Sequence, residues 1–404
     1  MKYSFDKEID RISSNSIKWN YIQNKNDFNV LQKTNAYYGE NRILPMWVAD
    51  MDFTCPQPVI DALATRAVHG IFGYTGTSDS YLNSVVNWMA KRHAWNIKPE
   101  WICTSPGVVP AINMLIRTFA KPDDKVIIQT PVYYPFFSAI KNNKRQIVEN
   151  PLIKDHDKYR IDFDDLDLKT KDPSSKLLIL CSPHNPVGRV WTNDELKKIG
   201  EICLKNKVLV ISDEIHSDLV FKEYKFTPFA TINETFKENC IVCTAASKTF
   251  NLAGLHTSNI IIPNENLRTK FMETIYSNGL AGMNTFGLLA TETAYNEGED
   301  WLEQVLSYIQ DNFTYLKNYI KENIPEIKVT ETEATYLIWL DFRGLKLSER
   351  ELRDFSVNKA GIFFDEGFIF GEPGIGFERI NIACPRSILE EGLIKLKNAA
   401  KSLR

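Results

Sequence analysis

The stretch AASKTFNLAG, residues 245–254, places a lysine directly after the apolar run CIVCT. A lysine at the end of a buried strand is unusual for a solvated charge, and an amine held in such a place can form a Schiff base with an aldehyde. The alternative is an ordinary charged residue, because a Ser-Lys pair by itself is a weak signal. Whether Lys248 is a nucleophile therefore depends on what the rest of the chain places around it.

Polar or aromatic side chains follow four apolar runs that we predict to be buried strands, at 125–131, 176–183, 207–214 and 240–247. In open parallel sheets, ligands bind beyond the carboxyl ends of the strands. The pattern therefore predicts one shared site. Its candidate members, in chain order, are Tyr133 and Tyr134, Asn185, Asp213 and His216, and Ser247 and Lys248.

Upstream, residues 101–121 predict a strand, a turn at Gly107 and an amphipathic helix. The free backbone amides at the start of such a helix suit an anion such as a phosphate.

Together these positions offer an amine, a carboxylate, an amide donor, an aromatic face and an anion cradle. Pyridoxal phosphate needs this combination for its aldehyde, pyridine nitrogen, ring oxygen, ring face and phosphate. Each residue also has a simpler interpretation: Asp213 as a helix cap, Asn185 as a turn residue before proline, and Tyr133 and His216 as core residues. Their ordered appearance at successive strand ends favours the cofactor site.

The middle of the chain alternates apolar runs with amphipathic stretches, which predicts an α/β fold around a mostly parallel sheet. Residues 192–206 predict a helix, with Thr192 as N-cap and Glu195 completing a capping box. Near residue 284 the pattern changes to a long helical stretch ending near Ile320, then a strand, a glycine-rich hairpin and a last helix. We expect an N-terminal segment (1–45) that joins a small α+β domain, a large domain (46–285) and the C-terminal small domain (286–404).

Composition narrows the class of protein. The formal net charge of −3 over 404 residues gives no electrostatic case for nucleic acid as a partner. We expect no membrane association and a cytoplasmic location, since there is no apolar run of roughly 18 residues and no signal-peptide core at the N-terminus. Seven dispersed cysteines suit reduced thiols, and we interpret Cys240 and Cys243 as buried thiols and expect no metal site.

From about residue 30 onwards the chain resembles the fold-type I pyridoxal-phosphate-dependent aminotransferase superfamily. Within it, the chain is similar to the MalY/PatB-type branch of cystathionine and cysteine-S-conjugate β-lyases. This resemblance implies an aspartate-aminotransferase-like fold with a mostly parallel seven-stranded sheet, pyridoxal 5'-phosphate as cofactor and a homodimer with shared active sites. The motifs that carry it are LPMWVADMDF (44–53), FGYTGTSDSY (72–81), TPVYYPF (130–136), SPHNPVGRVW (182–191), SDEIHSDLVF (212–221), ASKTFNLAGL (246–255) and RINIACPR (379–386).

The resemblance also implies roles. Lys248 would form the Schiff base and shuttle protons, Asp213 would pair with the pyridine nitrogen, and Asn185 would donate to the ring oxygen. Tyr133 would stack on the ring, and His216 would stand near the cofactor. The remaining implied residues are Gly107, Val108, Val109 and Ser247 at the phosphate, Tyr74 reaching the partner's site, and Arg379 with the backbone at Ala49 at the substrate carboxylate, with Arg386 a rival for the same role.

Departures from the aspartate-aminotransferase pattern stand near the expected phosphate site. His216 replaces a tyrosine, His256 an arginine and Ala245 a serine. They remove a positive charge and a hydroxyl there, but the histidines are compatible with the lyase branch.

The branch motifs and an aromatic-rich entrance favour β-elimination from a thioether amino acid over transamination. An aminotransferase remains the alternative, and a non-catalytic regulatory protein of the same fold is a remote one. The chain carries no glycine fingerprint of a nucleotide-dependent oxidoreductase.

Overall fold

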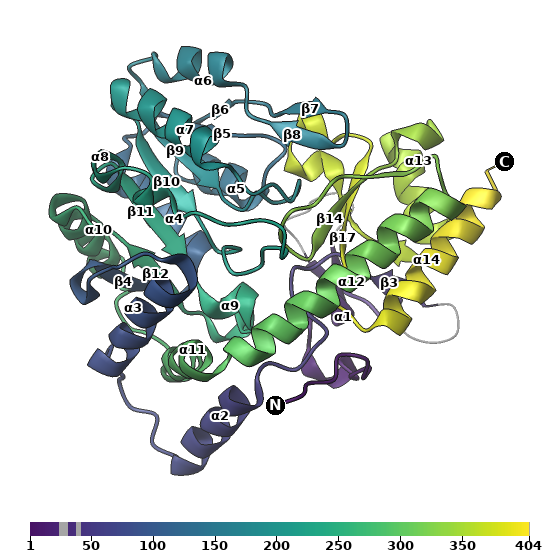
Figure 1. Ribbon diagram of the computed structural model, residues 1–404, viewed down its shortest axis with the longest axis horizontal. Helices are drawn as coiled ribbons and strands as arrows, with labels where there is room; N and C mark the ends of the chain where they lie inside the picture. The colour runs from purple at the N-terminus through teal and green to yellow at the C-terminus, as the bar shows by residue number, and fades with distance from the viewer. Residues whose placement is uncertain (24–30, 38–41, 404) are drawn as a thin grey trace. The chain divides into compact units, whose positions relative to one another are not determined.

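Seven strands form the central sheet of the unit that contains Lys248, in the order β4-β12-β11-β10-β9-β5-β6 (Figure 1). The strand β12 runs antiparallel to its neighbours β11 and β4, and the other neighbouring strands of this sheet pair parallel. The expected mostly parallel seven-stranded sheet is therefore confirmed. The strands are β4 (Ile102–Ser105), β12 (Ser258–Ile261), β11 (Cys240–Thr244), β10 (Leu209–Asp213), β9 (Ser175–Cys181), β5 (Lys125–Ile128) and β6 (Gln146–Glu149).

The computed structural model describes residues 1–23, 31–37 and 42–403, which divide into two units. The large unit comprises residues 55–303 and 333–335, and the small unit comprises residues 1–54, 304–332 and 336–404. Parts of the expected N-terminal segment, at 24–30 and 38–41, lie outside the described residues.

Both faces of the large sheet are covered, as parallel strands with continuous apolar runs require. On one face, alternate strand residues such as Ile128, Ile179 and Ile211 pack with α4, α5 and α10 in one apolar cluster. Residues between them, such as Leu178 and Val210, are also buried. The helices of this unit are α2 (Gln57–His69), α3 (Asp79–His93), α4 (Val108–Phe119), α5 (Pro135–Asn142), α6 (Phe163–Thr170), α7 (Asn193–Lys205), α8 (Glu234–Lys237), α9 (Ala246–Thr249), α10 (Glu265–Ser277) and α11 (Thr285–Glu297), and β7 (Ile153–Asp155) pairs with β8 (Lys158–Arg160).

Local sequence signals set several boundaries. Helix α7 begins after Thr192. The Thr192 side chain accepts a hydrogen bond from the Glu195 N–H, and the Glu195 carboxylate accepts one from the Thr192 N–H, so the predicted capping box is confirmed. The helical stretch expected from 284 to about 320 is instead two helices, α11 and α12 (Glu299–Asn323), separated at Gly298. A Cβ at Gly298 would lie 2.5 Å from the Ala294 oxygen and 2.6 Å from the Phe250 ring, so close packing at this break requires glycine.

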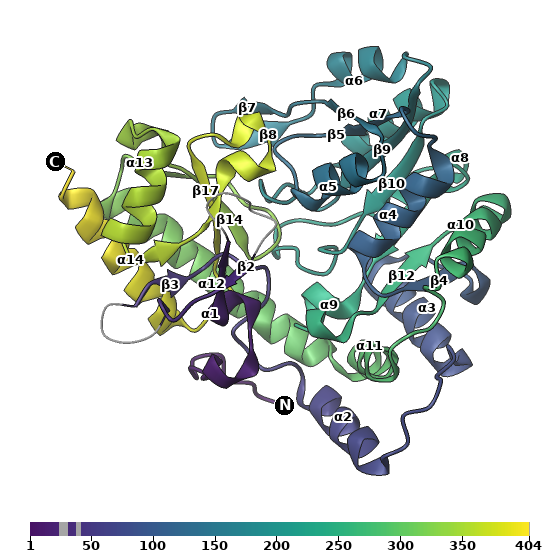
Figure 2. The same cartoon turned by 180° about the vertical axis from the view of Figure 1, so that it is seen from behind.

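The small unit is built on a four-stranded sheet in the order β13-β14-β17-β16. Figure 2 labels its two central strands, β14 and β17. The strands β16 and β17 pair antiparallel, as the expected hairpin requires, with two short 3₁₀ turns between them. Its elements are α1 (Ile17–Asn20), β1 (Tyr21–Gln23), β2 (Leu31–Lys33), β3 (Leu44–Pro45), β13 (Lys328–Val329), β14 (Leu337–Asp341), α13 (Glu349–Asp354), β15 (Ile362–Phe363), β16 (Asp365–Glu366), β17 (Phe377–Asn381) and α14 (Arg386–Lys401), and α12 belongs to it from residue 304.

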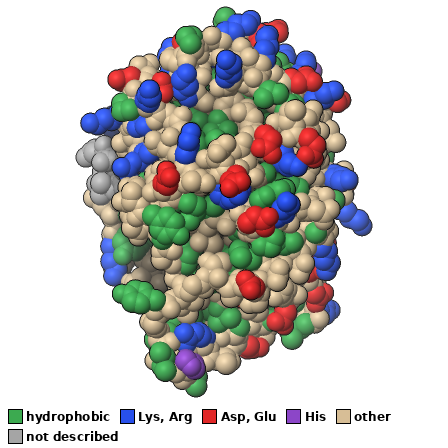
Figure 3. Space-filling model, turned by 90° about the vertical axis from the view of Figure 1, so that its left-hand side faces the viewer, with side chains coloured by type: hydrophobic (Ala, Val, Ile, Leu, Met, Phe, Trp, Pro, Cys, Tyr) green, Lys and Arg blue, Asp and Glu red, His purple; other side chains and the backbone are tan. Residues whose placement is uncertain are grey.

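The surface charges, the helices and the cysteines of the structure can each be compared with what the composition suggests. Acidic and basic side chains are interspersed on the face shown in Figure 3, as the small net charge of −3 suggests. Among the described residues, no helix has the length and apolar character that a membrane crossing needs. All seven cysteines are free, and the described part of the chain gathers no group of histidine, cysteine and acidic residues that could hold a metal ion.

Candidate active site

The strand register of the large unit brings Asn185, Asp213 and Lys248 to one edge of the sheet. Asp213, at the end of β10, pairs with Cys181 on β9 and with Cys243 on β11. Its carbonyl accepts the Ser182 N–H at 2.9 Å. Asn185 lies four residues beyond Cys181, and Lys248 lies on α9, five residues beyond Cys243. Three neighbouring strand ends thus carry an amide, a carboxylate and an amine side by side.

The carboxylate of Asp213 is held in an environment that calls for a cationic partner. Asp213 is 4% exposed, and burial raises the pKa of its carboxyl group to about 7. The hydrogen bond from the Ile215 N–H and the charge of Lys248 act to lower that pKa. The Ile215 N–H donates to Oδ1 at 3.2 Å. Because a buried carboxylate is costly without compensation, a protonated ring nitrogen beside it would be stabilised. Lys248 itself is half-buried.

The loops after β9 and β5 are tied together by His184, one residue before Asn185. His184 Nε2 lies 2.8 Å from the carbonyl oxygen of Pro131, two residues before Tyr133. Burial lowers the pKa of His184 to about 4, so the ring is neutral at pH 7 and Nε2 donates to that carbonyl. Asn185 is 3% exposed, and its N–H donates to Cys181 Sγ at 3.4 Å.

The start of α4 has the features of an anion cradle. Gly107 precedes the helix with φ 154° and ψ 161°, a backbone region that is essentially reserved for glycine. Gly107 has no side chain with which to cap the helix, so the amides of Val108 and Val109 at its first turn remain available to a ligand. Val108 is buried, and Gly107 and Val109 are half-buried.

The other predicted residues of the large unit differ in exposure. His216 is buried, Ser247 is half-buried, and Tyr133 is half-buried with its ring 5.5 Å from that of Tyr134. Tyr74, between α2 and α3, is fully exposed at 112%, so within one chain it does not pack against the rest of the site.

Two of the three positions that depart from the aspartate-aminotransferase pattern, Ala245 and His256, lie near Lys248 in sequence. Ala245 is buried, whereas His256 is exposed with a left-handed φ of 47°. The exposed His256 therefore places no buried charge where the aspartate-aminotransferase pattern has an arginine.

The small unit holds the two residues expected at the substrate carboxylate. Arg379 on β17 is 2% exposed; its Nη2 contacts the Asp365 carboxylate and donates to the Trp47 carbonyl at 3.0 Å. Burial raises the pKa of Asp365 to about 6, and Arg379 opposes this rise. The Tyr336 hydroxyl donates to the Ala49 carbonyl at 3.1 Å. The sequence pattern did not indicate Asp365, since only tertiary pairing of β16 with β17 sets it opposite Arg379.

The rival arginine, Arg386, is engaged at the start of α14. Its Nε donates to Asn312 Oδ1 at 2.7 Å, and its backbone N–H donates to the Tyr308 hydroxyl at 2.7 Å. These contacts join α14 to α12 and account for the side chain structurally.

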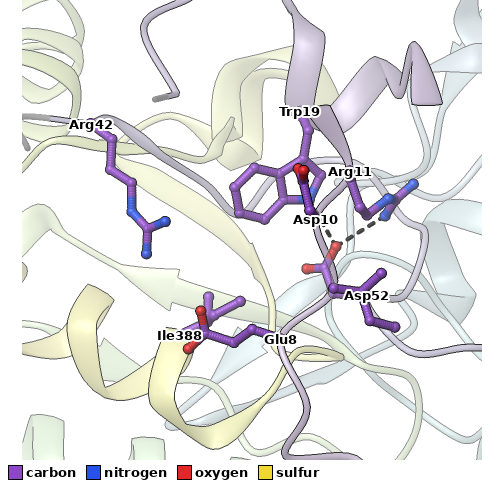
Figure 4. Close-up of a pocket in the computed structure, with 8 residues that line it drawn as sticks. Glu8, Asp10, Arg11, Trp19, Arg42, Asp52 and Ile388 are labelled. Carbon is purple, nitrogen blue, oxygen red and sulfur yellow. Dashed lines mark hydrogen bonds and ion pairs between the residues drawn. The ribbon is translucent and has the colours of Figure 1, made fainter. Parts of the chain in front are cut away.

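The loop at 47–53 is anchored through Asp52, which is 5% exposed. Three donors converge on its carboxylate: Lys18 Nζ at 2.6 Å, Trp19 Nε1 at 2.9 Å and Arg11 Nη1 at 3.0 Å. Figure 4 shows Trp19 and Arg11 directed at Asp52 beside a pocket of about 310 Å³. The N-terminal residues therefore hold the loop that carries Ala49.

Sequence reasoning did not select Asp218 and Thr249, which join the Asp213 loop to the Lys248 turn. Thr249 Oγ1 donates to Asp218 Oδ2 at 2.7 Å, with both residues buried. The available signal was a second carboxylate five residues after Asp213 and a threonine beside Lys248.

Comparison with known proteins places the chain in a family. The model of the family "Aminotransferase class I and II" matches residues 34–396. The chain is 42% identical to "Cystathionine beta-lyase PatB" of Bacillus subtilis, over 98% of this chain and 99% of that protein, and 32% identical to "Protein MalY" of Escherichia coli over the full length of both. A crystal structure of cystalysin from Treponema denticola, which contains pyridoxal 5'-phosphate, covers all of both chains with a TM-score of 0.93 and 44% identity. This chain therefore belongs to the aminotransferase class I and II family.

Proposed function

We propose that this protein is a pyridoxal-phosphate-dependent carbon–sulfur β-lyase. It cleaves cystathionine or a related cysteine S-conjugate to a thiol, pyruvate and ammonia. The observation that carries the proposal is the meeting of Lys248, Asp213 and Asn185 at one sheet edge, in a chain 42% identical over nearly all its length to a protein named as a cystathionine β-lyase.

The residues at the sheet edge fit the cofactor. Asp213 is a buried carboxylate that lacks full compensation, Lys248 is an amine within its electrostatic reach, and Gly107 opens an uncapped helix start. We assign Asp213 to the pyridine nitrogen, Asn185 to the ring oxygen and Tyr133 to the ring face. The phosphate is held by Gly107, Val108, Val109 and Ser247, and His216 supports the ring from the Asp213 loop.

When bound, pyridoxal phosphate supplies an aldehyde that captures the substrate amino group and a ring that takes up the electron pair from Cα. Lys248 accepts the Cα proton as a free amine and is the general base of the reaction. Asp213 keeps the ring nitrogen protonated through its negative charge. Loss of the thiolate from Cβ then completes the elimination, and the product hydrolyses to pyruvate and ammonia.

We assign binding of the substrate α-carboxylate to Arg379 and the backbone at Ala49. A guanidinium offers paired donors that match a carboxylate. The contacts of Arg379 with Asp365 and the Trp47 carbonyl fix the orientation of its guanidinium plane. The anchored loop at 47–53 fixes the position of the Ala49 backbone.

A second copy of the chain is part of the proposal, with Tyr74 acting on the substrate in the partner's site. Support comes from exposed apolar side chains in the last turn of α2 and in the segment that follows it: Val68 at 88%, Ile71 at 68%, Phe72 at 55% and Tyr74 at 112%. A segment so rich in exposed apolar surface suits an interface. We also propose a cytoplasmic location, which the seven free thiols support.

The deciding experiment gives purified protein, reconstituted with pyridoxal phosphate, L-cystathionine without any keto acid. We expect sustained and equal release of pyruvate and free thiol. If the cofactor absorption bleaches after one turnover and recovers only on addition of a keto acid, the enzyme is an aminotransferase and the lyase proposal is wrong.

A further inference from the structure

Asp218 lies at the centre of a buried hydrogen-bond cluster in the large unit. It is 4% exposed and follows Asp213 by five residues on the same loop. Its Oδ1 accepts from Trp88 Nε1 at 3.1 Å and lies 2.8 Å from His93 Nε2, while Oδ2 accepts from Thr249 Oγ1 at 2.7 Å. Both carboxylate oxygens are therefore engaged by donors from two other segments, α3 and α9.

Burial acts to raise the pKa of Asp218, but hydrogen bonding and charge from His93, with the Thr249 hydroxyl, hold it below its usual range. A buried charge with several donors fixes the positions of those donors, because each lost contact would leave the carboxylate undercompensated. The cluster is thus a rigid junction rather than an incidental contact.

The segment that carries Lys248 needs an external support. Helix α9 is a single turn of four residues, and Ala245 before it has no side chain able to cap it. One turn of helix is unstable alone, so its orientation is set by tertiary contacts. Thr249, adjacent to Lys248, supplies one such contact through Asp218. Phe250 supplies another, since its ring packs against that of Trp88 in a T-shaped arrangement, with the two ring centroids 5.6 Å apart.

The loop that carries Asp213 and His216 is held at the same junction. Its turns are closed by the Ser217 N–H to the Glu214 carbonyl at 3.0 Å and the Leu219 N–H to the His216 carbonyl at 2.9 Å. Asp218 lies within these turns. A displacement of Asp218 would therefore move the Asp213 loop and the Lys248 turn relative to each other.

We propose that Asp218 is a positioning residue for the reaction, which holds the Lys248 turn in register with the Asp213 loop through the Thr249 hydroxyl. The inference rests on the proposed role of Lys248. It extends the site to a set of residues, Asp218, Thr249, Trp88 and His93, that act through Lys248 and Asp213 rather than on the substrate.

The test compares Thr249→Val, Thr249→Ser and a matched control, Thr170→Val, in the full-length protein. Thr170 is also a buried threonine, 1% exposed, whose hydroxyl donates to the Leu166 carbonyl at 3.0 Å and accepts from Asn206 Nδ2 at 2.9 Å. Three quantities are measured: the Kd of the apo-protein for pyridoxal phosphate, the yield of borohydride trapping at Lys248 by mass spectrometry, and kcat and KM for L-cystathionine.

We expect Thr249→Val to weaken cofactor binding about tenfold and to lower kcat at least about tenfold, with KM within about threefold of wild type. Thr249→Ser keeps the donor and stays within about threefold on each quantity. Thr170→Val lowers the melting temperature comparably but leaves Kd and kcat within about twofold. If Thr249→Val behaves as Thr170→Val does, the contact is only structural and the proposal is wrong.

Asp218→Asn keeps the shape, removes the charge and sets an amide nitrogen against a donor. It is expected to reproduce the loss in Kd and trapping, and wild-type values in this variant would overturn the proposal even if Thr249→Val failed to fold. Cofactor binding and trapping need no turnover, so they test positioning independently of the lyase reaction. A wild-type protein that binds cofactor but releases no pyruvate would refute the proposed reaction alone.

Discussion

Replacing Arg379 by methionine should destabilise the small unit in a pH-dependent way. Arg379 is 2% exposed and Asp365 is 1% exposed, so the variant would leave a carboxylate buried without its counter-charge. Breaking such a pair typically costs about 3–5 kcal/mol. With Arg379 present, burial already raises the pKa of Asp365 from 3.8 to about 6. This shift corresponds to about 3 kcal/mol of stability lost above pH 6, at about 1.36 kcal/mol per pKa unit.

The sign of the pH effect follows from proton binding. Between about pH 4 and the folded-state pKa, the folded chain retains a proton on Asp365 that the unfolded chain has lost, so stability falls as the pH rises. Without Arg379 the folded-state pKa rises further, so the fall continues beyond pH 6. The deficit of Arg379→Met relative to wild type should therefore be small at pH 5, where Asp365 is protonated in both, and large at pH 8.

The assay is thermal unfolding of wild type, Arg379→Met and Arg379→Met/Asp365→Asn at pH 5 and pH 8. Each kcal/mol should appear as roughly 2–4 °C in a domain-sized unit. The double variant should recover most of the loss at pH 8, because it removes the uncompensated charge. Lys91→Met serves as control: its partner is Glu299, the two side chains are 66% and 37% exposed, and such pairs contribute at most about 1 kcal/mol. A deficit that is equal at both pH values would refute this reasoning.

Other outcomes are expected at the large unit. Lys248→Ala should abolish both the absorption band of covalently held pyridoxal phosphate and turnover, and retention of both would contradict its role. Asp213→Ala should keep some cofactor but lose activity by about a hundredfold or more, measured as pyruvate release; near-wild-type rates would argue against its charge. Glu214→Gln should gain stability relative to wild type as the pH rises from about 4.5 to 8, because burial raises the pKa of Glu214 to about 8 and the folded wild-type protein keeps a proton there that its unfolded chain has lost; thermal unfolding at pH 5 and pH 9 tests this, and a constant difference would count against it. Thr192→Ala should cost about 1 kcal/mol through loss of the α7 cap, with kcat unchanged; an unchanged melting temperature would show that the cap contributes nothing.

Local signals in the sequence determined much of the large unit. The apolar runs that end in polar residues became β5, β9, β10 and β11, because continuous burial on both faces requires such runs. The capping box at Thr192 acts through residues three apart. The order of Asn185, Asp213 and Lys248 at successive strand ends predicted a shared site, since parallel strands present their carboxyl ends at one edge. The domain boundaries at 45 and 285, as limits of parts that fold by themselves, stay a prediction.

Only the tertiary structure decided which distant residues support these side chains. The pairing of β16 with β17 places Asp365 opposite Arg379. The carboxylate of Asp52 accepts hydrogen bonds from three residues of the N-terminal segment, Lys18, Trp19 and Arg11. The Thr249 hydroxyl donates to Asp218, which lies on a different loop. The predicted helical stretch is interrupted at Gly298, where the ring of Phe250 leaves no room for a side chain. Such contacts join residues without a fixed spacing in the chain. Periodicity and caps act over a few residues, whereas the satisfaction of a buried charge depends on every segment that folds against it.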